Sequence, residues 1–217
     1  MAQVMLKQKK MLRAQVISRL KGLGADKRKW FSAQIARRFV ASAEFGAASV
    51  VLAYDSFGTE VDTHPLMELC LERRKTLCLP RMGRKGHSLT AHAVSDLKRD
   101  LVPVPFGFLQ PKETTPSVPI AQLDLILVPG IAFDIHCHRL GRGAGYYDRF
   151  LPLVRAARVS KRPEDRSLTV AAPTVQSPAV VCALAFECQI VDAVPVEKHD
   201  WPLQLIFTEE RVIRSGK

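Results

Sequence analysis

Apolar residues recur every three or four positions near the start of the chain. Leu12, Val16, Leu20 and Leu23 share this spacing, which would place them on one face of a helix. We therefore expect an amphipathic helix over residues 4–22. The glycines that follow suit its end, because glycine adopts the left-handed backbone of a helix C-terminus without strain.

A second helix is expected directly afterwards. Asp26 stands where an N-cap residue would accept hydrogen bonds from the free amides of the first turn. Phe31, Ile35 and Phe39 then form one apolar stripe at helical spacing. Both helices should bury such stripes against the rest of the protein.

From residue 48 onward, short apolar runs alternate with helical patterns. The run 48–54 is largely apolar, as in a strand buried on both faces. The other expected strands are 76–79, closed by Pro80, then 89–94, 123–128, 180–184 and 204–207, and the expected helices are 64–74 and one that follows Gly145. This alternation predicts an α/β fold in three layers, with a mainly parallel sheet, helices on both faces and basic N-terminal helices.

Two segments show neither period. The proline-rich stretch 103–119 is expected to be an irregular loop, because proline lacks the amide proton that helices and sheets use. Residues 156–178 are rich in Arg, Lys, Pro and Ser and are expected to form a surface insertion. No Gly/Ser or proline-rich linker divides the chain, so residues 1–217 are expected to form a single domain.

The composition adds constraints on size and compartment. With 217 residues, 47% of them hydrophobic, the chain can bury a substantial core, and it contains no apolar run long enough to span a bilayer. The five cysteines include no Cys-x-x-Cys pair, which favours a reducing compartment over a disulfide framework. We expect a cytoplasmic protein, with a mitochondrial location as the alternative.

Positive charge is concentrated near the N-terminus. The chain carries a net charge of +11, of which residues 1–43 contribute +10 through eleven Lys or Arg residues and one acid. Four interpretations are open: a solvated helix face, a surface for nucleic acid or another polyanion, a mitochondrial transit peptide, and the rim of a site for an anionic substrate. The regular capping pattern argues against a cleaved leader.

The segment 124–151 carries the clearest chemical pattern. A predicted strand ends near Pro129, at the sheet edge where open α/β folds bind ligands. Gly141, Gly143 and Gly145 then alternate with other residues and lead into a predicted helix. Such a loop presents free amides and the positive end of a helix dipole, which suits phosphate. It matches neither GxGxxG nor GxxxxGK[ST], so both nucleotide fingerprints are rejected, and a glycine connection without a ligand remains the alternative.

Charged residues surround this loop. Arg139, Arg142 and Arg149 are placed to reach phosphate oxygens. Asp148 falls in the first turn of the predicted helix. It either complements the helix dipole or holds Mg²⁺ between the protein and ATP.

This region resembles the signature of the 5-formyltetrahydrofolate cyclo-ligase family, in the runs PGIAFD at 129–134 and RLGRGAGYYD at 139–148. Further similarities follow the family's order along nearly the whole chain: KKMLR at 9–13, EVDT at 60–63, LPR at 79–81, AFE at 185–187 and VPVEKHD at 194–200. Together these ordered matches are specific, whereas any one alone is not. The chain departs from the family at Ala144, where Gly or Lys is frequent, and at Gln110, where many members have Glu.

The resemblance implies an ATP- and Mg²⁺-dependent cyclisation of 5-formyltetrahydrofolate to 5,10-methenyltetrahydrofolate, with release of ADP and phosphate. The family phosphorylates the formyl oxygen, and N10 then attacks. Catalytic roles are implied for Arg142 and Tyr146, and Mg²⁺ binding for Asp148 and Asp200. The residues implied for folate are Glu60, Phe106, Arg142 and Tyr146. The residues implied for ATP are Lys9, Lys10, Arg13, Arg139, Leu140, Gly141, Arg142, Gly143, Ala144, Gly145, Tyr146 and Tyr147.

Other classes of function compete with this interpretation. A nucleic-acid-binding module on the basic helices would leave the glycine loop without a role, and its affinity would collapse with salt. A different ATP-dependent ligase or kinase would yield no methenyl product. We expect instead a monomer acting on 5-formyltetrahydrofolate, with or without a polyglutamate tail, that binds neither nucleic acid nor membrane.

Two histidine-containing patterns are expected to have neither a metal-binding nor a catalytic role. His136, Cys137 and His138 are consecutive on a predicted loop and lack an evident fourth ligand, so a metal site is disfavoured. His199 beside Asp200 has the residue types of an acid–base pair. We expect it to flank the magnesium aspartate only.

Overall fold

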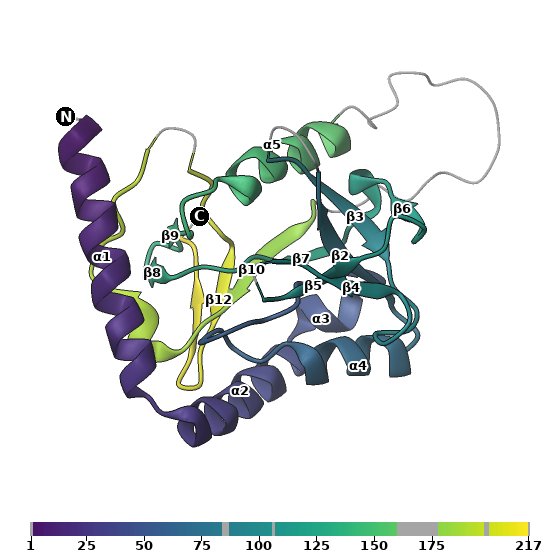
Figure 1. The fold of residues 1–217 in the computed structure, drawn as a ribbon, viewed down its shortest axis with the longest axis horizontal. Coiled ribbons are helices and arrows are strands. Elements are labelled where there is room, and N and C mark those ends of the chain that lie inside the picture. Colours follow the sequence, from purple (N-terminus) through teal and green to yellow (C-terminus); the bar gives the residue numbers. More distant parts are fainter. Residues whose placement is uncertain (1, 84–86, 106, 160–177, 198–199, 217) are drawn as a thin grey trace.

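Five parallel strands form the centre of an eight-stranded sheet in the computed structural model, which describes residues 2–83, 87–105, 107–159, 178–197 and 200–216 (Figure 1). The sheet has the order β13–β12–β10–β7–β1–β2–β3–β6; the strands from β12 to β2 run parallel, whereas β13, β3 and β6 are antiparallel to their neighbours. Its strands are β1 (Val50–Leu52), β2 (Thr76–Met82), β3 (Leu89–Ala93), β6 (Ser117–Val118), β7 (Leu125–Leu127), β10 (Val180–Leu184), β12 (Leu205–Phe207) and β13 (Val212–Arg214).

Smaller elements complete the described part of the chain. Two minor sheets contain β4 (Leu101–Pro103) with β5 (Leu109–Pro111), and β11 (Ile190–Val191) with β8 (Ala132–Asp134) and β9 (Arg139–Leu140). The helices are α1 (Ala2–Gly22), α2 (Ala25–Val40), α3 (Ala43–Ala47), α4 (His64–Glu72) and α5 (Tyr146–Val159), with 3-10 turns at Ile120–Gln122 and Glu187–Gln189. Within the described residues, no helix is both long and apolar enough to cross a membrane.

The order of the parallel strands creates a switch point between β1 and β7. The chain pairs β2 with one side of β1 and later returns to pair β7 with the other side. In open α/β sheets, the crevice beyond the carboxyl ends of the strands at such a point is where ligands bind. The segments that follow β1 and β7 are therefore placed to build a site.

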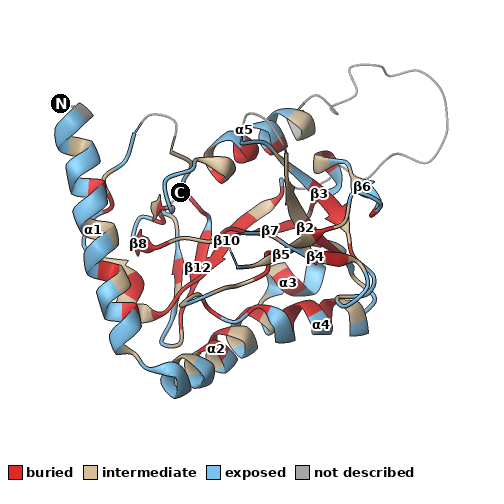
Figure 2. Ribbon diagram, in the orientation of Figure 1, coloured by how far each residue is buried: buried red, intermediate tan, exposed pale blue. Residues whose placement is uncertain are grey.

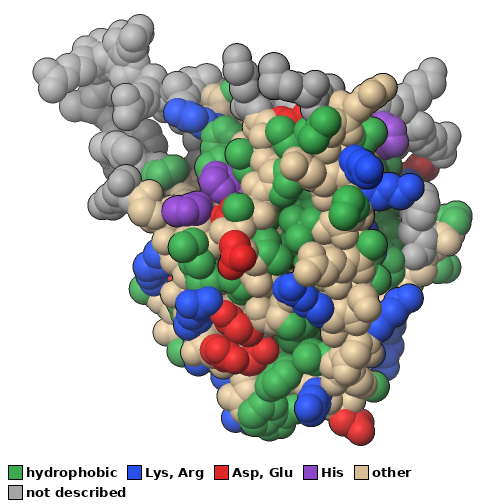
Figure 3. All heavy atoms as spheres, turned by 90° about the vertical axis from the view of Figure 1, so that its left-hand side faces the viewer, with side chains coloured by type: hydrophobic (Ala, Val, Ile, Leu, Met, Phe, Trp, Pro, Cys, Tyr) green, Lys and Arg blue, Asp and Glu red, His purple; other side chains and the backbone are tan. Residues whose placement is uncertain are grey.

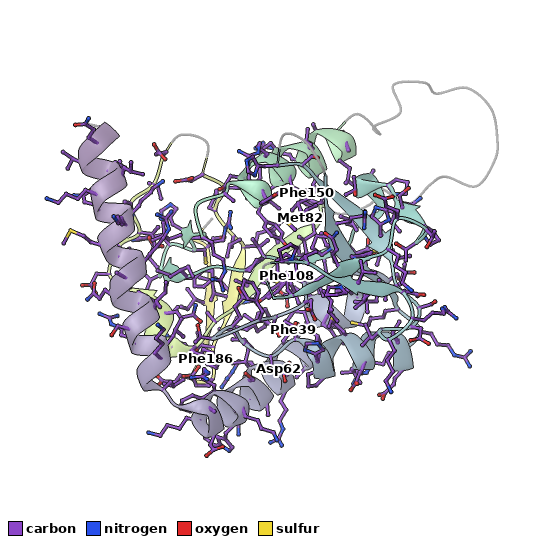
Figure 4. The ribbon with its side chains drawn as sticks, viewed as in Figure 1. Phe39, Asp62, Met82, Phe108, Phe150 and Phe186 are labelled. Atoms are coloured by element: carbon purple, nitrogen blue, oxygen red, sulfur yellow. The ribbon has the colours of Figure 1, made fainter. Side chains whose placement is uncertain are left out.

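Apolar side chains cover both faces of the sheet. Leu125 and Leu127 of β7 belong to the same core cluster as Phe39 of α2, whereas Ile126 belongs to the cluster that contains Phe150 of α5. Figure 4 shows Phe150 above the sheet and Phe39 below it, and Figure 1 shows α2, α3 and α4 below the sheet and α5 above it. The central strands are mostly buried in Figure 2, as a parallel sheet requires. The α/β class with a mainly parallel sheet is confirmed.

The N-terminal helices form where the apolar spacing predicts them, but the N-cap of α2 differs from the predicted residue. Ile35 and Phe39 are buried in α2. Gly24, with φ of 72°, precedes α2, and no side chain caps it. Because the chain turns through the left-handed backbone of Gly24, the helix already begins at Ala25. Asp26 therefore lies inside the first turn, and its prediction as the N-cap is wrong.

Three other predictions need correction. Strand β2 does not stop at Pro80 but continues to Met82, because β1 pairs only with residues 76–78 and so needs no amide from Pro80. The stretch 103–119 is not wholly irregular, since β5 and β6 form there. In the expected insertion 156–178, residues 156–159 continue α5, and residues 160–177 lie outside the described part of the chain.

Candidate active site

A cavity of about 740 Å³ opens beyond the carboxyl ends of β1 and β7. Its walls come from α1, the segment after β1, the loop that leads into α5, and the segment after β11. Met82 and Phe108, which also line it, lie below α5 in Figure 4. A second hollow, of about 640 Å³, is lined by Lys75, Thr76 and their neighbours at the start of β2, and it contains none of the predicted site residues.

The glycine loop adopts a backbone that glycine takes without strain. Gly143 and Gly145 have φ of 108° and 70°. Helix α5 begins directly afterwards at Tyr146 and runs for 14 residues. Its first amides have no partner within the helix, and its dipole is positive at this end. The loop therefore brings backbone donors to the cavity wall.

Arg139 is almost fully buried in the cavity wall. Its guanidinium donates to the carbonyl oxygen of Pro129 at 3.2 Å and to the carboxylate of Asp148. Burial lowers the pKa of this guanidinium, although the Asp148 charge opposes that effect. Among the residues that the structure describes, the Arg139 Nε finds no hydrogen-bond partner. A buried cation with an unsatisfied donor is suited to an anionic ligand.

Lys9 joins α1 to the segment after β11. Its Nζ donates to Glu197 Oε2 at 2.8 Å and to Asp200 Oδ2 at 3.0 Å. Burial lowers the pKa of Lys9, but the hydrogen bonds to both carboxylates outweigh it and hold the pKa above its usual value. We call Lys9, Arg139, Asp148, Glu197 and Asp200 the charged cluster.

One turn further along α1, Arg13 reaches the glycine loop. Its Nε donates to the carbonyl oxygen of Gly141 at 2.8 Å. Lys9 and Arg13 are four residues apart and so share a helix face. This spacing explains how a single helix closes one side of the cavity.

A second group of residues combines aromatic rings with an ion pair. Phe57 and Phe108 lie with ring centroids 5.3 Å apart, and the guanidinium of Arg142 stacks 4.3 Å from the Phe57 centroid. Arg142 also donates to Glu60 Oε1 at 2.8 Å. Burial raises the pKa of Glu60, and its bonds with Arg142 counteract that rise. We call Phe57, Glu60, Phe108 and Arg142 the aromatic cluster.

The cavity unites nearly all residues that the sequence implied for ligand binding. Lys9, Arg13, Glu60, Asp200 and the loop 139–148 line it together. Lys10 does not; its side chain is exposed on α1, so the ATP contact implied for it lacks support. Phe106 lies outside the described residues, as does His199. The individual ligand roles stay predictions.

Several lining residues escaped the sequence reasoning. Phe57 lies in the loop between the strand at 48–54 and Glu60. Its place three residues before Glu60 could have suggested a role in the same site. Phe108 is two residues from Phe106, and its contact with Phe57 is known only from the fold. Glu197 stands within the run 194–200, but its contact with Lys9 joins positions 188 apart in sequence. No local pattern would have revealed that contact.

The described residues include no group of three or more His, Cys, Asp or Glu side chains that could hold a metal. Cys137 is buried, and His138 Nδ1 lies 3.0 Å from Asp134 Oδ2. This arrangement is consistent with a structural role for the 136–138 loop. Asp148 forms an ion pair with Arg139, and Asp148 and Asp200 both line the cavity, so its wall includes two hard oxygen donors.

Comparisons of the sequence and of the fold with known proteins identify the same family. A family model described as the 5-formyltetrahydrofolate cyclo-ligase family matches residues 5–209. A 5-formyltetrahydrofolate cyclo-ligase of Mus musculus is 28% identical and aligns over 93% of this chain and 94% of its own. A protein of the same name from Mycolicibacterium smegmatis is 31% identical over 75% of each chain. The solved structure of Aquifex aeolicus 5,10-methenyltetrahydrofolate synthetase superposes with a TM-score of 0.75 at 26% identity, covering 96% of this chain and 93% of that one.

Proposed function

The chain belongs to the 5-formyltetrahydrofolate cyclo-ligase family, and from this premise we propose that it converts 5-formyltetrahydrofolate and ATP into 5,10-methenyltetrahydrofolate, ADP and phosphate. The observation that carries the proposal is the single cavity at the switch point. It joins the glycine loop, two aspartates and an aromatic cluster. Such a cavity offers one group of residues suited to a triphosphate and another group suited to a flat heterocycle.

The reaction needs activation of a formamide, which is a poor electrophile. In the proposed sequence the formyl oxygen accepts the γ-phosphoryl group of ATP, and ADP leaves. The N10 nitrogen then attacks the formyl carbon and loses its proton to solvent, the carbon–oxygen bond breaks, and phosphate departs with that oxygen. Phosphoryl transfer of this kind depends on positioning and charge neutralisation, without a covalent nucleophile from the protein.

The residues around the glycine loop fit a triphosphate. The unsatisfied Nε of buried Arg139 offers a donor to an anion, and Lys9 and Arg13 face the same cavity from α1. The amides at the start of α5 add neutral donors. We propose that these groups hold ATP and neutralise the charge that shifts during transfer.

Asp148 and Asp200 fit a magnesium site. Their carboxylates border the region of Arg139, and hard oxygen donors are the ligands that Mg²⁺ prefers. When bound, Mg²⁺ supplies positive charge to the phosphate oxygens. Asp148 additionally orients Arg139 through their ion pair, so it would position two charges in the same site.

The aromatic cluster fits the folate. Phe57 and Phe108 offer ring faces for the pterin, and Glu60 offers a buried acceptor for its ring N–H groups. Arg142 touches both Phe57 and Glu60 and also belongs to the glycine loop. We propose that Arg142 and Tyr146, at the junction of the two substrates, contact the reacting formyl group.

The basic N-terminus fits this account without a nucleic-acid function. Lys9 and Arg13 face the cavity, while Arg28 and Arg38 donate to backbone carbonyls within the protein. Figure 3 shows the Lys and Arg side chains of the α1 side scattered among apolar and acidic ones, without a continuous basic patch. We propose one domain that acts as a monomer in the cytoplasm and binds neither nucleic acid nor membrane.

The direct test is an absorbance assay with 5-formyltetrahydrofolate and MgATP. The proposal predicts a near-ultraviolet rise from methenyltetrahydrofolate that requires ATP and Mg²⁺. Omission of ATP, and replacement of Mg²⁺ by a chelator, serve as controls. A folded sample that consumes ATP without this rise would point to another ligase or kinase, and a sample that does neither would overturn the proposal.

A further inference from the structure

The ammonium group of Lys9 lies between two carboxylates. Its Nζ is 2.8 Å from Glu197 and 3.0 Å from Asp200, and only 11% of the Lys9 side chain is exposed. The backbone amide of Glu197 also donates to Asp200 Oδ2 at 2.8 Å. Lys9 is therefore fully engaged with protein acids in the structure described here.

This pairing conflicts with the tasks that the proposed function gives to the same groups. Lys9 is assigned to the triphosphate, and Asp200 to Mg²⁺. An ammonium beside Asp200 repels a metal ion and lowers its affinity, and a carboxylate that holds Lys9 competes with phosphate. Both ligands therefore compete with an existing ion pair.

Glu197 has no task in the proposed reaction, yet it makes the shortest of these contacts. With 43% of its side chain exposed, Glu197 keeps its contact with water when Lys9 moves away, so its carboxylate is not left desolvated. Asp200, at 17% exposure, is less well solvated and would gain more from a replacement cation. The two acids thus differ in what they lose when Lys9 leaves.

We propose that Glu197 is a positioning residue that holds Lys9 until nucleotide arrives, and that Mg²⁺ and nucleotide bind by exchange of this ion pair. Mg²⁺ takes Asp200, the triphosphate takes Lys9, and Glu197 releases its contact with Lys9. This inference rests on the proposed function and adds a coupling to it. Because such coupling is reciprocal, weakening the pair should favour each ligand even in the absence of the other.

The exchange has a signature that a purely structural role for Glu197 would not produce. Glu197→Gln should tighten the binding of metal-free ADP, although the residue is not assigned to the nucleotide. Lys9→Met should tighten the binding of Mn²⁺ alone, used as a probe for Mg²⁺, because Asp200 loses its competitor. We expect about threefold to fivefold in each case, the range for partly exposed ion pairs.

The experiment measures both affinities calorimetrically, ADP with a chelator present and Mn²⁺ without nucleotide. Asp192→Asn is the matched control for Glu197→Gln, because it removes the same charge from an exposed site in the same segment. Lys7→Met is the control for Lys9→Met, since Lys7 is exposed on α1. Both controls should bind like the wild type.

The outcomes separate this inference from the proposed function. Tighter ADP binding by Glu197→Gln together with tighter Mn²⁺ binding by Lys9→Met supports the exchange. If the wild type binds MgADP but Glu197→Gln binds metal-free ADP no more tightly than Asp192→Asn, the exchange is wrong and the proposed function stands. If the wild type binds no nucleotide even with Mg²⁺, both are overturned. The Mn²⁺ titration decides independently should Glu197→Gln fail to fold.

Discussion

The charged cluster and the aromatic cluster of the cavity are held together by different kinds of interaction. In the charged cluster, Lys9 and Arg139 are neutralised by acids from other parts of the chain. In the aromatic cluster, the Phe57 ring packs against Phe108 and under the guanidinium of Arg142, and an ion pair of Arg142 with Glu60 completes the group. The first holds its shape by exchangeable ion pairs, and the second by packing.

Because of this difference, the two clusters suit different ligands. Ion pairs can be replaced by phosphate and metal, so the charged cluster suits ligands that carry charge of both signs. Stacked rings keep their area whichever flat ligand enters, so the aromatic cluster suits a neutral heterocycle. Substitutions in the two clusters should therefore affect different substrates.

The largest effect is expected for Asp148→Asn in the charged cluster. The variant loses a proposed Mg²⁺ ligand and the charge partner of buried Arg139. Loss of several kcal/mol of charge stabilisation lowers the turnover rate roughly a thousandfold. Steady-state kinetics with Asp192→Asn as the control measure this effect. A variant with nearly wild-type turnover would remove Asp148 from the metal site.

Gly145→Ala should weaken nucleotide binding about tenfold. The backbone at this position has φ of 70°, where a side chain costs about 1–2 kcal/mol. A Cβ there would also lie 2.9 Å from the guanidinium of Arg149, so the end of that flexible side chain must move aside. Gly46→Ala is the matched control, because nothing lies within 4 Å of a Cβ there and its backbone is not left-handed. Titration of MgADP compares the two; equal affinities would show that the loop does not bind phosphate.

Phe57→Leu should act on the folate alone. Loss of the ring removes stacking worth about 1 kcal/mol, which raises the KM for 5-formyltetrahydrofolate about fivefold and leaves the KM for ATP unchanged. Trp30→Leu, a change of an exposed aromatic residue on α2, should alter neither constant. Should the KM for ATP rise as much as that for folate, the division into two clusters fails.

The smallest effect concerns the pH dependence of stability at Glu60. Burial raises the pKa of this carboxyl above its ordinary value of 4.5. Its favourable contribution is therefore complete below that value and is lost as pH rises through the raised pKa. Relative to wild type, Glu60→Gln should gain stability between about pH 4 and pH 7, by about 1 kcal/mol or less since Arg142 offsets burial. Urea unfolding at both pH values measures the difference, and a constant or falling difference would contradict the account.

The sheet and its main helices could be predicted because they depend on local patterns. The strand at 180–184 was bounded correctly, and the helix after the glycine loop begins at Tyr146. Short strands such as β8, β9 and β11 could not, since two or three residues carry no period and form only through tertiary pairing. The continuation of β2 through Pro80 likewise depends on tertiary pairing, because residues 79–82 pair with β3 beyond the end of β1.

In the candidate site, too, local motifs could be predicted from the sequence, whereas contacts between distant segments could not. The glycine loop, Asp148 and Asp200 could be proposed from ordered motifs, and the fold brings them to one cavity. The contact of Phe57 with Phe108 and the bridge from Lys9 to Glu197 could not, because each joins segments that are distant in sequence. Motifs identify reactive groups, whereas their partners in the absence of ligand emerge only from the three-dimensional arrangement.

The fate of the formyl oxygen shows whether ATP phosphorylates it. Substrate labelled with ¹⁸O at that position is converted with MgATP, and the released phosphate is examined by mass spectrometry. Phosphorylation of the formyl oxygen predicts one ¹⁸O atom in phosphate for each methenyltetrahydrofolate formed. Unlabelled phosphate alongside methenyl product would contradict the account, because ATP would then be cleaved without activating the formyl group.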